Sequence, residues 1–250
     1  MTGAASGIGQ ATARLLGEEG HRVIGVDLRD GDVTGDLSTE AGRLKVIDGV
    51  NSLTNGRVDG VIAAAGLAAD AVSTAAVNFF GAVATLRGLR PLLAASPSPA
   101  AVVVTSVGAT SDFDPDLLEA FRQEDEERAL ARAADLVSTR GLIYKTSKKA
   151  VARWVRAQAP TSEWAGAGIA LNAVGPGMVE TPMISQSLST PEGRARLFAN
   201  FPMPLTGLAQ PSDIARTLIW LTEAQNRHIT GQVIFVDGGA EAVVRGEHVI

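Results

Sequence analysis

The sequence contains no cysteine among its 250 residues, and only 4% of the residues are aromatic. Without cysteine the chain cannot form a disulfide framework, a thiolate metal site or a thiol nucleophile. The three histidines do not gather with carboxylates along the sequence, so no metal site is expected. These absences exclude disulfide-stabilised folds and thiol-dependent enzymes.

An excess of positive charge is also lacking, because 22 basic residues stand against 27 acidic ones and the formal net charge is −5. This balance argues against a non-specific binder of nucleic acids or anionic membranes. The apolar runs, such as residues 60–69, are too short to span a bilayer. Because residue 2 already belongs to a motif, no space remains for a signal peptide. We therefore expect a cytoplasmic protein.

Short apolar runs alternate with longer helical patterns along the whole chain. The expected strands are rich in Val, Ile and Ala on both faces, as buried parallel strands are, and cover residues 21–27, 57–66, 100–106, 168–174 and 231–237. The expected helices cover residues 8–19, 40–53, 70–94, 142–164 and 211–224, the last with Ser212 as its N-cap. This alternation predicts an α/β protein with a Rossmann-type doubly wound parallel sheet. No linker divides the chain, so residues 1–250 are expected to form one domain.

Two stretches interrupt this alternation. Residues 107–141 contain an acidic helical segment with an apolar stripe made of Leu117, Leu118, Phe121 and Leu130. Residues 183–208 form a long connection after a Pro-Gly turn. Connections of this length inside a compact domain are usually functional or mobile.

The chain begins with a glycine-rich segment that places glycines at positions 3, 7 and 9. Glycines allow the backbone to approach a pyrophosphate closely, and the N-terminus of the helix that starts near Ile8 favours its negative charge. Such a turn on its own is often only a turn. A dinucleotide site becomes the stronger interpretation because an acidic residue, Asp27, ends the next expected strand.

An acid at the position of Asp27 can accept hydrogen bonds from both hydroxyls of an adenosine ribose and repels a 2′-phosphate. Neither residues 5 and 6 nor Leu28 offers a cation for that phosphate. Arg29 is the one candidate against this interpretation. We expect NAD as the cofactor rather than NADP.

Tyr144 is the only tyrosine of the chain, and Lys148, one of four lysines, follows it four residues later. This spacing puts both side chains on one face of a helix. A nearby ammonium favours the phenolate and is expected to lower the tyrosine pKa from near 10 towards working pH. A general acid–base for the interconversion of carbonyl and alcohol needs such a group. The alternative is an exposed tyrosine beside a solvated lysine, in a helix that also carries Lys145 and Lys149.

Together, the glycine pattern and the Tyr-x-x-x-Lys pattern resemble those of the short-chain dehydrogenase/reductase family. Further segments resemble family motifs in the same order along the chain: "GDLS" with Asp36 and Leu37, "VNFFGA" with Asn78, "VVVTSV" with Ser106, "NAVGPGMVETPM" with Pro176, Gly177 and Thr181, and "FVDGG". Short motifs match by chance, but several in the correct order do not.

The resemblance implies roles for individual residues. Tyr144 would transfer the proton, Ser106 would hold the substrate oxygen, and Lys148 would lower the tyrosine pKa and bind the nicotinamide ribose. Asn78 would hold a water in a proton relay. The cofactor-binding residues implied are Gly3, Ser6, Gly7, Ile8, Gly9, Asp27, Leu28, Asp36, Leu37, Ala65, Gly66, Tyr144, Lys148, Pro176, Gly177, Val179 and Thr181.

Within the family, the amino-acid sequences of several segments and the long interval between Ser106 and Tyr144 are similar to those of the bacterial 3α-hydroxysteroid dehydrogenase/carbonyl reductase group. A bulky apolar, steroid-like substrate is therefore expected. Six apolar residues of the connection after Gly177 are candidates for the wall of its cleft: Met183, Ile184, Leu188, Phe198, Phe201 and Met203. For each one, the alternative is that it merely packs the connection onto the domain.

Many relatives form dimers or tetramers by pairing the helices that carry the equivalents of Asn78 and Tyr144. The acidic segment 107–141 precedes the Tyr144 helix, and we expect it to cover this surface. A homo-oligomer, if formed, would then associate through another face; the alternative is a solvated excursion without a role in assembly.

The resemblance also implies a central strand directly before Thr2, and the sequence lacks the residues for it. Three interpretations remain open: a start codon further upstream, which we favour for the gene, a fold in which a gap or another segment takes the place of the strand, and an inactive remnant. The leading functional hypothesis is an NAD-dependent oxidoreductase acting on a secondary alcohol or ketone. The alternative is a non-catalytic dinucleotide-binding protein of the same fold.

Overall fold

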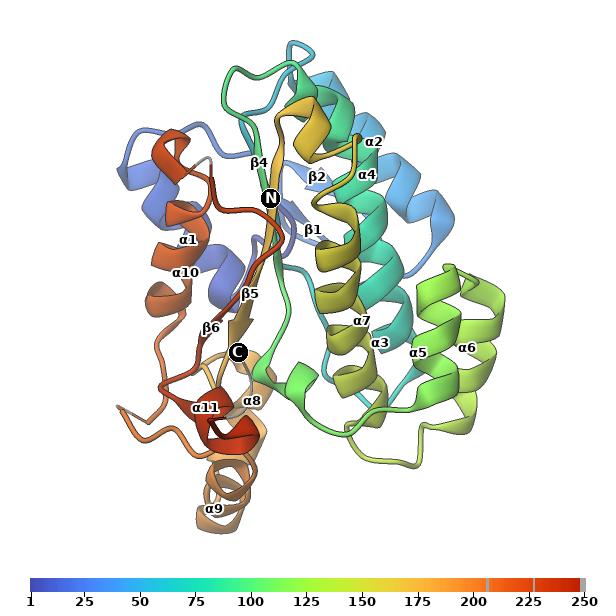
Figure 1. The fold of residues 1–250 in the computed structure, drawn as a ribbon, viewed down its shortest axis with the longest axis vertical. Helices are drawn as coiled ribbons and strands as arrows, with labels where there is room; N and C mark the ends of the chain where they lie inside the picture. Colours follow the sequence, from blue (N-terminus) through green and yellow to red (C-terminus); the bar gives the residue numbers. More distant parts are fainter. Residues whose placement is uncertain (206, 227, 248–250) are drawn as a thin grey trace.

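The computed structural model describes residues 1–205, 207–226 and 228–247. A parallel sheet with helices on both sides forms its centre (Figure 1). The strands are β1 (Val26–Asp27), β2 (Val33–Thr34), β3 (Gly60–Ala63), β4 (Ala100–Val104), β5 (Ala170–Pro176) and β6 (Val233–Val236). β1 pairs with β2, and β3 to β6 follow one another in a four-stranded part. The Rossmann-type parallel sheet expected from the sequence is thus confirmed.

The helices of the chain lie in layers on the sheet. Figure 1 shows α1 and α10 on one side, α2, α4 and α7 on the other, and α5 and α6 as an outer pair beyond α4 and α7. The helical segments are α1 (Gly7–Glu18), α2 (Glu40–Leu53), α3 (Val72–Ala75), η1 (Ala76–Gly81), α4 (Ala82–Ala94), η2 (Val107–Thr110), α5 (Pro115–Gln123), α6 (Glu126–Asp135), α7 (Leu142–Gln158), η3 (Ala165–Ala167), α8 (Pro182–Leu188), α9 (Pro191–Asn200), α10 (Pro211–Trp220), η4 (Ala224–Asn226) and α11 (Ala240–Arg245).

The two faces of β4 show why this strand is apolar throughout. Successive side chains of a strand point to opposite faces. Val102 and Val104 join the core beneath α1 and α10, whereas Ala101 and Val103 join the core beneath α4 and α7. Because helices cover both faces, every residue of β4 is buried, and the strand reads as an uninterrupted apolar run.

The segment Val72–Ala94 is long and apolar enough to cross a membrane by length and composition, but 67% of its most apolar window is buried inside the protein. It packs as a core helix. The sequence predicts one helix over residues 70–94, whereas the structure inserts the π-helical turn η1 between α3 and α4. That turn carries Asn78.

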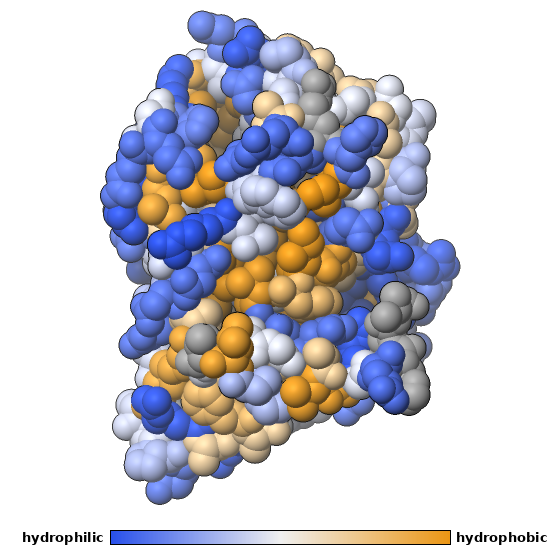
Figure 2. Space-filling view, turned by 60° about the vertical axis from the view of Figure 1, so that its left-hand side comes forward, coloured by the Kyte–Doolittle hydropathy of each residue, from blue (hydrophilic) through white to orange (hydrophobic). Residues whose placement is uncertain are grey.

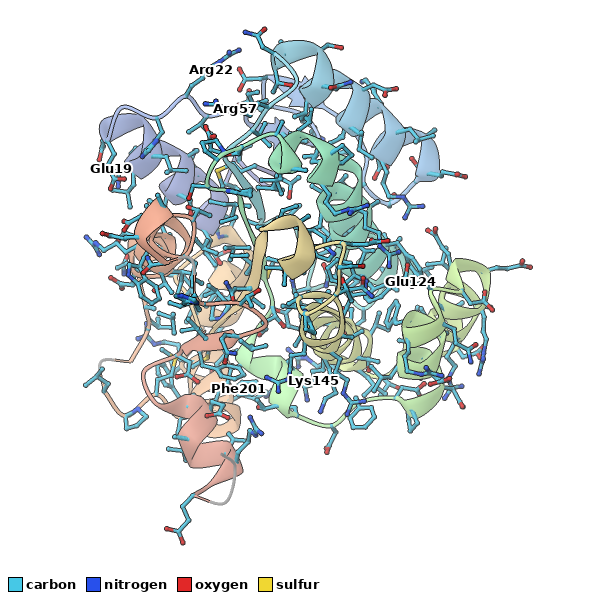
Figure 3. All side chains as sticks on the ribbon, turned by 45° about the horizontal axis from the view of Figure 1, so that its top comes forward. Glu19, Arg22, Arg57, Glu124, Lys145 and Phe201 are labelled. Carbon is cyan, nitrogen blue, oxygen red and sulfur yellow. The ribbon has the colours of Figure 1, made fainter. Side chains whose placement is uncertain are left out.

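The acidic segment 107–141 folds onto the helices as expected. Phe121 of α5 is fully buried, and its ring centroid lies 4.6 Å from that of Phe79. Glu124, at the end of α5, pairs with Arg87 of α4 and accepts a hydrogen bond from Trp154 of α7 at 3.3 Å (Figure 3). The outer pair α5–α6 therefore covers surface of both α4 and α7. Association through another face stays a prediction.

Two parts of the sheet meet at Thr2. This residue bridges to Val26 of β1 and to Ala63 of β3, and its backbone nitrogen donates to the Ile62 carbonyl at 2.9 Å. On the amino side of this bridge lies a cavity of about 650 Å³, with Met1, Leu16, Val23, Ile24, Val50, Val61 and Leu89 in its wall and Arg22 and Arg57 (Figure 3) among its lining residues. Among the described residues, Thr2 alone bridges β1 and β3, and the cavity lies beside it.

The Met1 ammonium lies in this wall. It donates a hydrogen bond to the Ile24 carbonyl at 2.6 Å, and burial lowers the pKa of the amino group to about 6.

Some predicted boundaries are wrong. β1 covers only the last two residues of the expected strand 21–27, and β2 was not expected. Helix α7 ends at Gln158 rather than at residue 164. Helix α10 begins at Pro211, with Gln210 and not Ser212 at its N-cap, because Gln210 and Asp213 bond each other's backbone nitrogens.

Candidate active site

A cleft of about 670 Å³ opens at the carboxyl ends of β1, β3, β4 and β5. In open α/β sheets this edge is where ligands bind. Every residue expected to bind a cofactor lines this one cleft, and so does Ser106; Asn78 lies next to it. The segments that carry these residues are separated by up to 178 positions, from Gly3 to Thr181.

The glycine-rich loop has a backbone that other residues could not follow. Gly3 and Gly7 have φ values of +72° and +52°, which favour glycine. A Cβ on Gly9 would lie 1.9 Å from the Gly3 carbonyl oxygen. Helix α1 starts within this segment, at Gly7, without a side-chain cap and without an acid in its first turn. Its free N–H groups fit the pyrophosphate of a dinucleotide.

Two carboxylates, those of Asp27 and Asp36, lie at one end of the cleft. Asp27 is the last residue of β1, and its carboxylate accepts hydrogen bonds from the backbone nitrogens of Ala5 at 3.0 Å and Leu28 at 2.7 Å. Hydrogen bonds from Ser38 lower the pKa of Asp36. Arg29 is exposed and does not line the cleft.

Ser106 lies where β4 ends and η2 begins. Its hydroxyl oxygen accepts a hydrogen bond from the Gly108 nitrogen at 3.1 Å and lies beside the Tyr144 hydroxyl. The pKa of Tyr144 is raised by the burial of its hydroxyl, which outweighs the lowering effect of the Ser106 hydrogen bond. The lowered pKa expected from the sequence is therefore not found, because burial of the phenol dominates.

Lys148 lies one helical turn after Tyr144 on the same face of α7, as the spacing predicts. Its ammonium is 5.9 Å from the centre of the tyrosine ring and donates to the Val104 carbonyl at 2.9 Å. The side chain is only 4% exposed, and burial lowers its pKa to about 8. The alternative of an exposed tyrosine beside a solvated lysine is thus wrong.

Asn78 is held by the π-helical turn η1. Its side-chain amide donates to the Leu67 carbonyl at 2.9 Å and to Ser147 at 3.1 Å, and its oxygen accepts from the Leu67 nitrogen at 2.8 Å. A Cβ on Gly66 would lie 3.2 Å from that oxygen and 3.3 Å from the Lys148 ammonium. Asn78 therefore joins η1 to α7 directly behind the cleft. Single π turns of this kind are frequent at functional sites.

Known proteins share this architecture. The chain is 35% identical to the 3-alpha-hydroxysteroid dehydrogenase/carbonyl reductase of Comamonas testosteroni over 98% of its own length and 96% of that protein. It belongs to the short-chain dehydrogenase/reductase family. A family model described as enoyl-(acyl carrier protein) reductase matches residues 130–241. The 3-oxoacyl-[acyl-carrier-protein] reductase FabG of Thermotoga maritima is 28% identical over 96% of the chain and 95% of that protein.

Among solved structures, the 3-alpha-hydroxysteroid dehydrogenase of Pseudomonas sp. B-0831, complexed with NADH, is 37% identical. The two structures superimpose with a TM-score of 0.90, and the match covers 99% of this chain and 98% of the Pseudomonas chain. This short-chain dehydrogenase/reductase is therefore an oxidoreductase that acts on a small molecule with a nicotinamide dinucleotide.

The other end of the cleft in this family member lies between the end of β5 and the segment α8–α9. A Cβ on Gly7 would lie 3.2 Å from the Thr181 methyl group, so the glycine-rich loop and the segment after β5 face each other closely. Helices α8 and α9 lie at the lower end of the molecule in Figure 1, and apolar patches appear at this height in Figure 2.

Three of the six apolar residues expected in the cleft wall do line it, namely Met183, Ile184 and Phe201. Met203 is 6% exposed and forms a small core, against which Phe198 packs. For these two, the alternative of packing is correct, and Leu188 does not line the cleft.

Other residues that line the cleft of this dehydrogenase/reductase were not predicted from the sequence. They include Leu67, Ala68, Ser73, Val77, Thr105, Lys145 and Leu197. Leu67, Ala68 and Leu197 are apolar residues outside the quoted motifs, whereas Val77 and Thr105 lie within two of these motifs but had no role assigned. Lys145 stood out only as a further basic residue next to Tyr144.

Proposed function

We propose that this short-chain dehydrogenase/reductase interconverts a secondary alcohol and a ketone with NAD(H), on a bulky apolar, steroid-like substrate. The observation that carries the proposal is the meeting of Ser106, Tyr144 and Lys148 in one cleft between a glycine-rich cradle and an apolar wall. A protein that only binds dinucleotides does not need this set.

The bound nicotinamide supplies or accepts a hydride. Ser106 donates a hydrogen bond to the substrate oxygen, and Tyr144 moves the proton between that oxygen and the protein. Because the raised pKa keeps Tyr144 protonated near neutral pH, the phenol can donate a proton to a carbonyl as it is reduced. Oxidation of the alcohol needs the phenolate, and the Lys148 ammonium stabilises that charge. Asn78 holds η1 against α7 and binds the water of the proton relay.

We assign NAD rather than NADP because of Asp27. A carboxylate that can accept hydrogen bonds from two ribose hydroxyls repels a 2′-phosphate. The positive charge of Arg29 would instead favour a 2′-phosphate. Asp27→Asn should reduce the ratio of kcat/KM for NADH to that for NADPH about tenfold or more. Asp30→Asn removes an equal charge from an exposed neighbour and should leave the ratio unchanged.

A steroid-like substrate is supported by the apolar wall of Met183, Ile184 and Phe201 and by relatives named as hydroxysteroid dehydrogenases. The test is the oxidation of NADH, followed by absorbance, with a panel of steroid and alicyclic ketones. Tyr144→Phe should abolish turnover and retain NADH binding, measured by fluorescence. NADH binding without turnover of any ketone would support the non-catalytic alternative, and turnover by Tyr144→Phe would refute the assigned role.

We place the enzyme in the cytoplasm and expect a homo-oligomer that does not associate through α4 and α7, because α5 and α6 cover them. Light scattering will give the mass of the protein in solution and therefore the number of subunits. Charge-reversing substitutions of exposed residues on α5–α6 should leave it unchanged; dissociation would contradict the proposed arrangement.

A further inference from the structure

Lys145 lies at the mouth of the cleft. It follows Tyr144 directly in the first turn of α7 and lines the cleft. The side chain runs past two glycines: a Cβ on Gly108 would lie 3.8 Å from its Cγ, and a Cβ on Gly141 would lie 4.0 Å from its Cε. Figure 3 shows Lys145 and Phe201 at the same end of the molecule, and both line the cleft.

The ammonium of Lys145 forms no hydrogen bond or ion pair with the described residues 1–205, 207–226 and 228–247. Asp70 accepts a hydrogen bond from the Gly141 nitrogen at 2.6 Å and does not pair with Lys145. The next cations along the same stripe of α7 do have contacts. Lys149 lies 4.4 Å and Arg153 5.6 Å from the centre of the Phe113 ring.

Lys145 shares its stripe of α7 with two other cations, Lys149 and Arg153. Like charges one helical turn apart destabilise a helix, and Lys145 and Lys149 have this spacing. Burial and the nearby Arg153 and Arg245 lower the pKa of Lys149, and Asp112 opposes this only in part. Lys145 is half-buried, lines the cleft and has no hydrogen bond or ion pair for its ammonium among the described residues, so it can bind an anion that enters the cleft.

The charges that line the cleft are divided between its two ends. Asp27 and Asp36 lie at one end, and Lys145 and Lys148 lie at the other. Lys148 is buried and bonded to the Val104 carbonyl. Lys145 is thus the one free cation beside the apolar wall among the lining residues that the structure describes.

We propose that Lys145 binds a carboxylate on the substrate. The substrate would then be an alicyclic oxo acid or hydroxy acid, with its apolar ring against Met183, Ile184 and Phe201, its reacting oxygen at Tyr144, and its carboxylate at the mouth. This inference rests on the proposed alcohol–ketone reaction and narrows its substrate class.

The test compares 4-oxocyclohexanecarboxylate with its methyl ester, which share the ring and the ketone and differ in charge. With NADH in excess, kcat/KM for the acid should exceed that for the ester about tenfold, through a lower KM. Added salt should reduce the difference, because the ammonium is partly exposed. Lys145→Met, which retains most of the aliphatic stem, should bring the ratio of acid to ester close to one.

Arg156→Met is the matched control. Arg156 is exposed on the same helix, about 16 Å further along its axis. Its removal takes one positive charge from α7 and should leave the ratio unchanged. A ratio that falls equally in both variants would indicate general attraction and overturn direct binding by Lys145.

The two proposals fail in different ways. If acid and ester are reduced equally well by the unchanged enzyme, the carboxylate site is refuted and the alcohol–ketone reaction stands. If neither these ketones nor the steroid panel is reduced while NADH binds, the proposed reaction is refuted and the carboxylate site with it.

Discussion

Replacing Lys148 by methionine should change how the stability of the protein depends on pH. Burial lowers the pKa of this lysine from its usual 10.5 to about 8. Between these values the unfolded chain binds a proton that the folded protein does not, so the free energy of unfolding rises with pH in this range. The gain is about 2.5 kcal/mol from pH 7 to pH 10. Below pH 8 both states hold the proton, and the cost of the buried ammonium is fully present.

The assay is urea unfolding at pH 7, 8, 9 and 10, followed by the fluorescence of the buried Trp154 and Trp164. The range ends at pH 10 because Tyr144, with its raised pKa, titrates above it. Relative to the unchanged protein, Lys148→Met should lose this rise in stability, whereas Lys45→Met, at an exposed site on α2, should retain it. A constant difference between unchanged protein and Lys148→Met over the whole range would refute the reasoning.

Three further predictions concern the fold and the cofactor cradle. Phe121→Ala removes a fully buried ring and should destabilise the protein by about 3–5 kcal/mol in urea unfolding. Gly9→Ala places a Cβ 1.9 Å from the Gly3 oxygen and should weaken NADH binding at least tenfold in a fluorescence titration. Asp114→Asn keeps the N-cap of α5 but loses the 2.7 Å ion pair with Arg132. Because that pair lowers the pKa of Asp114, its contribution is present above pH 3.8 and lost below it, so variant and unchanged protein should converge in stability in acid.

The sequence predicted the fold well where local pattern and burial agree. Helix α2 has the expected bounds, because an N-cap threonine and a loss of helical pattern mark its ends. The pairing of Tyr144 with Lys148 also follows from helical spacing alone. All expected cofactor residues line one cleft, since the parallel strands that precede many of them end at the same edge.

Features that depend on contacts between distant segments were not predictable. The π turn carries Asn78, which donates a hydrogen bond to Ser147 of α7, and an apolar sequence pattern does not distinguish such a turn from an α-helical one. The high pKa of Tyr144 results from the depth of the assembled cleft. Lys145 lies about 100° around the helix from Tyr144, and only the fold of the loops at Gly108 and Gly141 brings it to the same opening.

The single bridge at Thr2 has a consequence for how the two parts of the sheet move. Asp27 belongs to the part built on β1 and β2, whereas Lys148 packs on the end of β4. A dinucleotide held by both residues would connect the two parts of the sheet without any backbone hydrogen bond between their strands. We therefore expect the amide protons of β1 and β2 to exchange with deuterated solvent much more slowly once NADH is bound, while those at the centre of β4 and β5 change little.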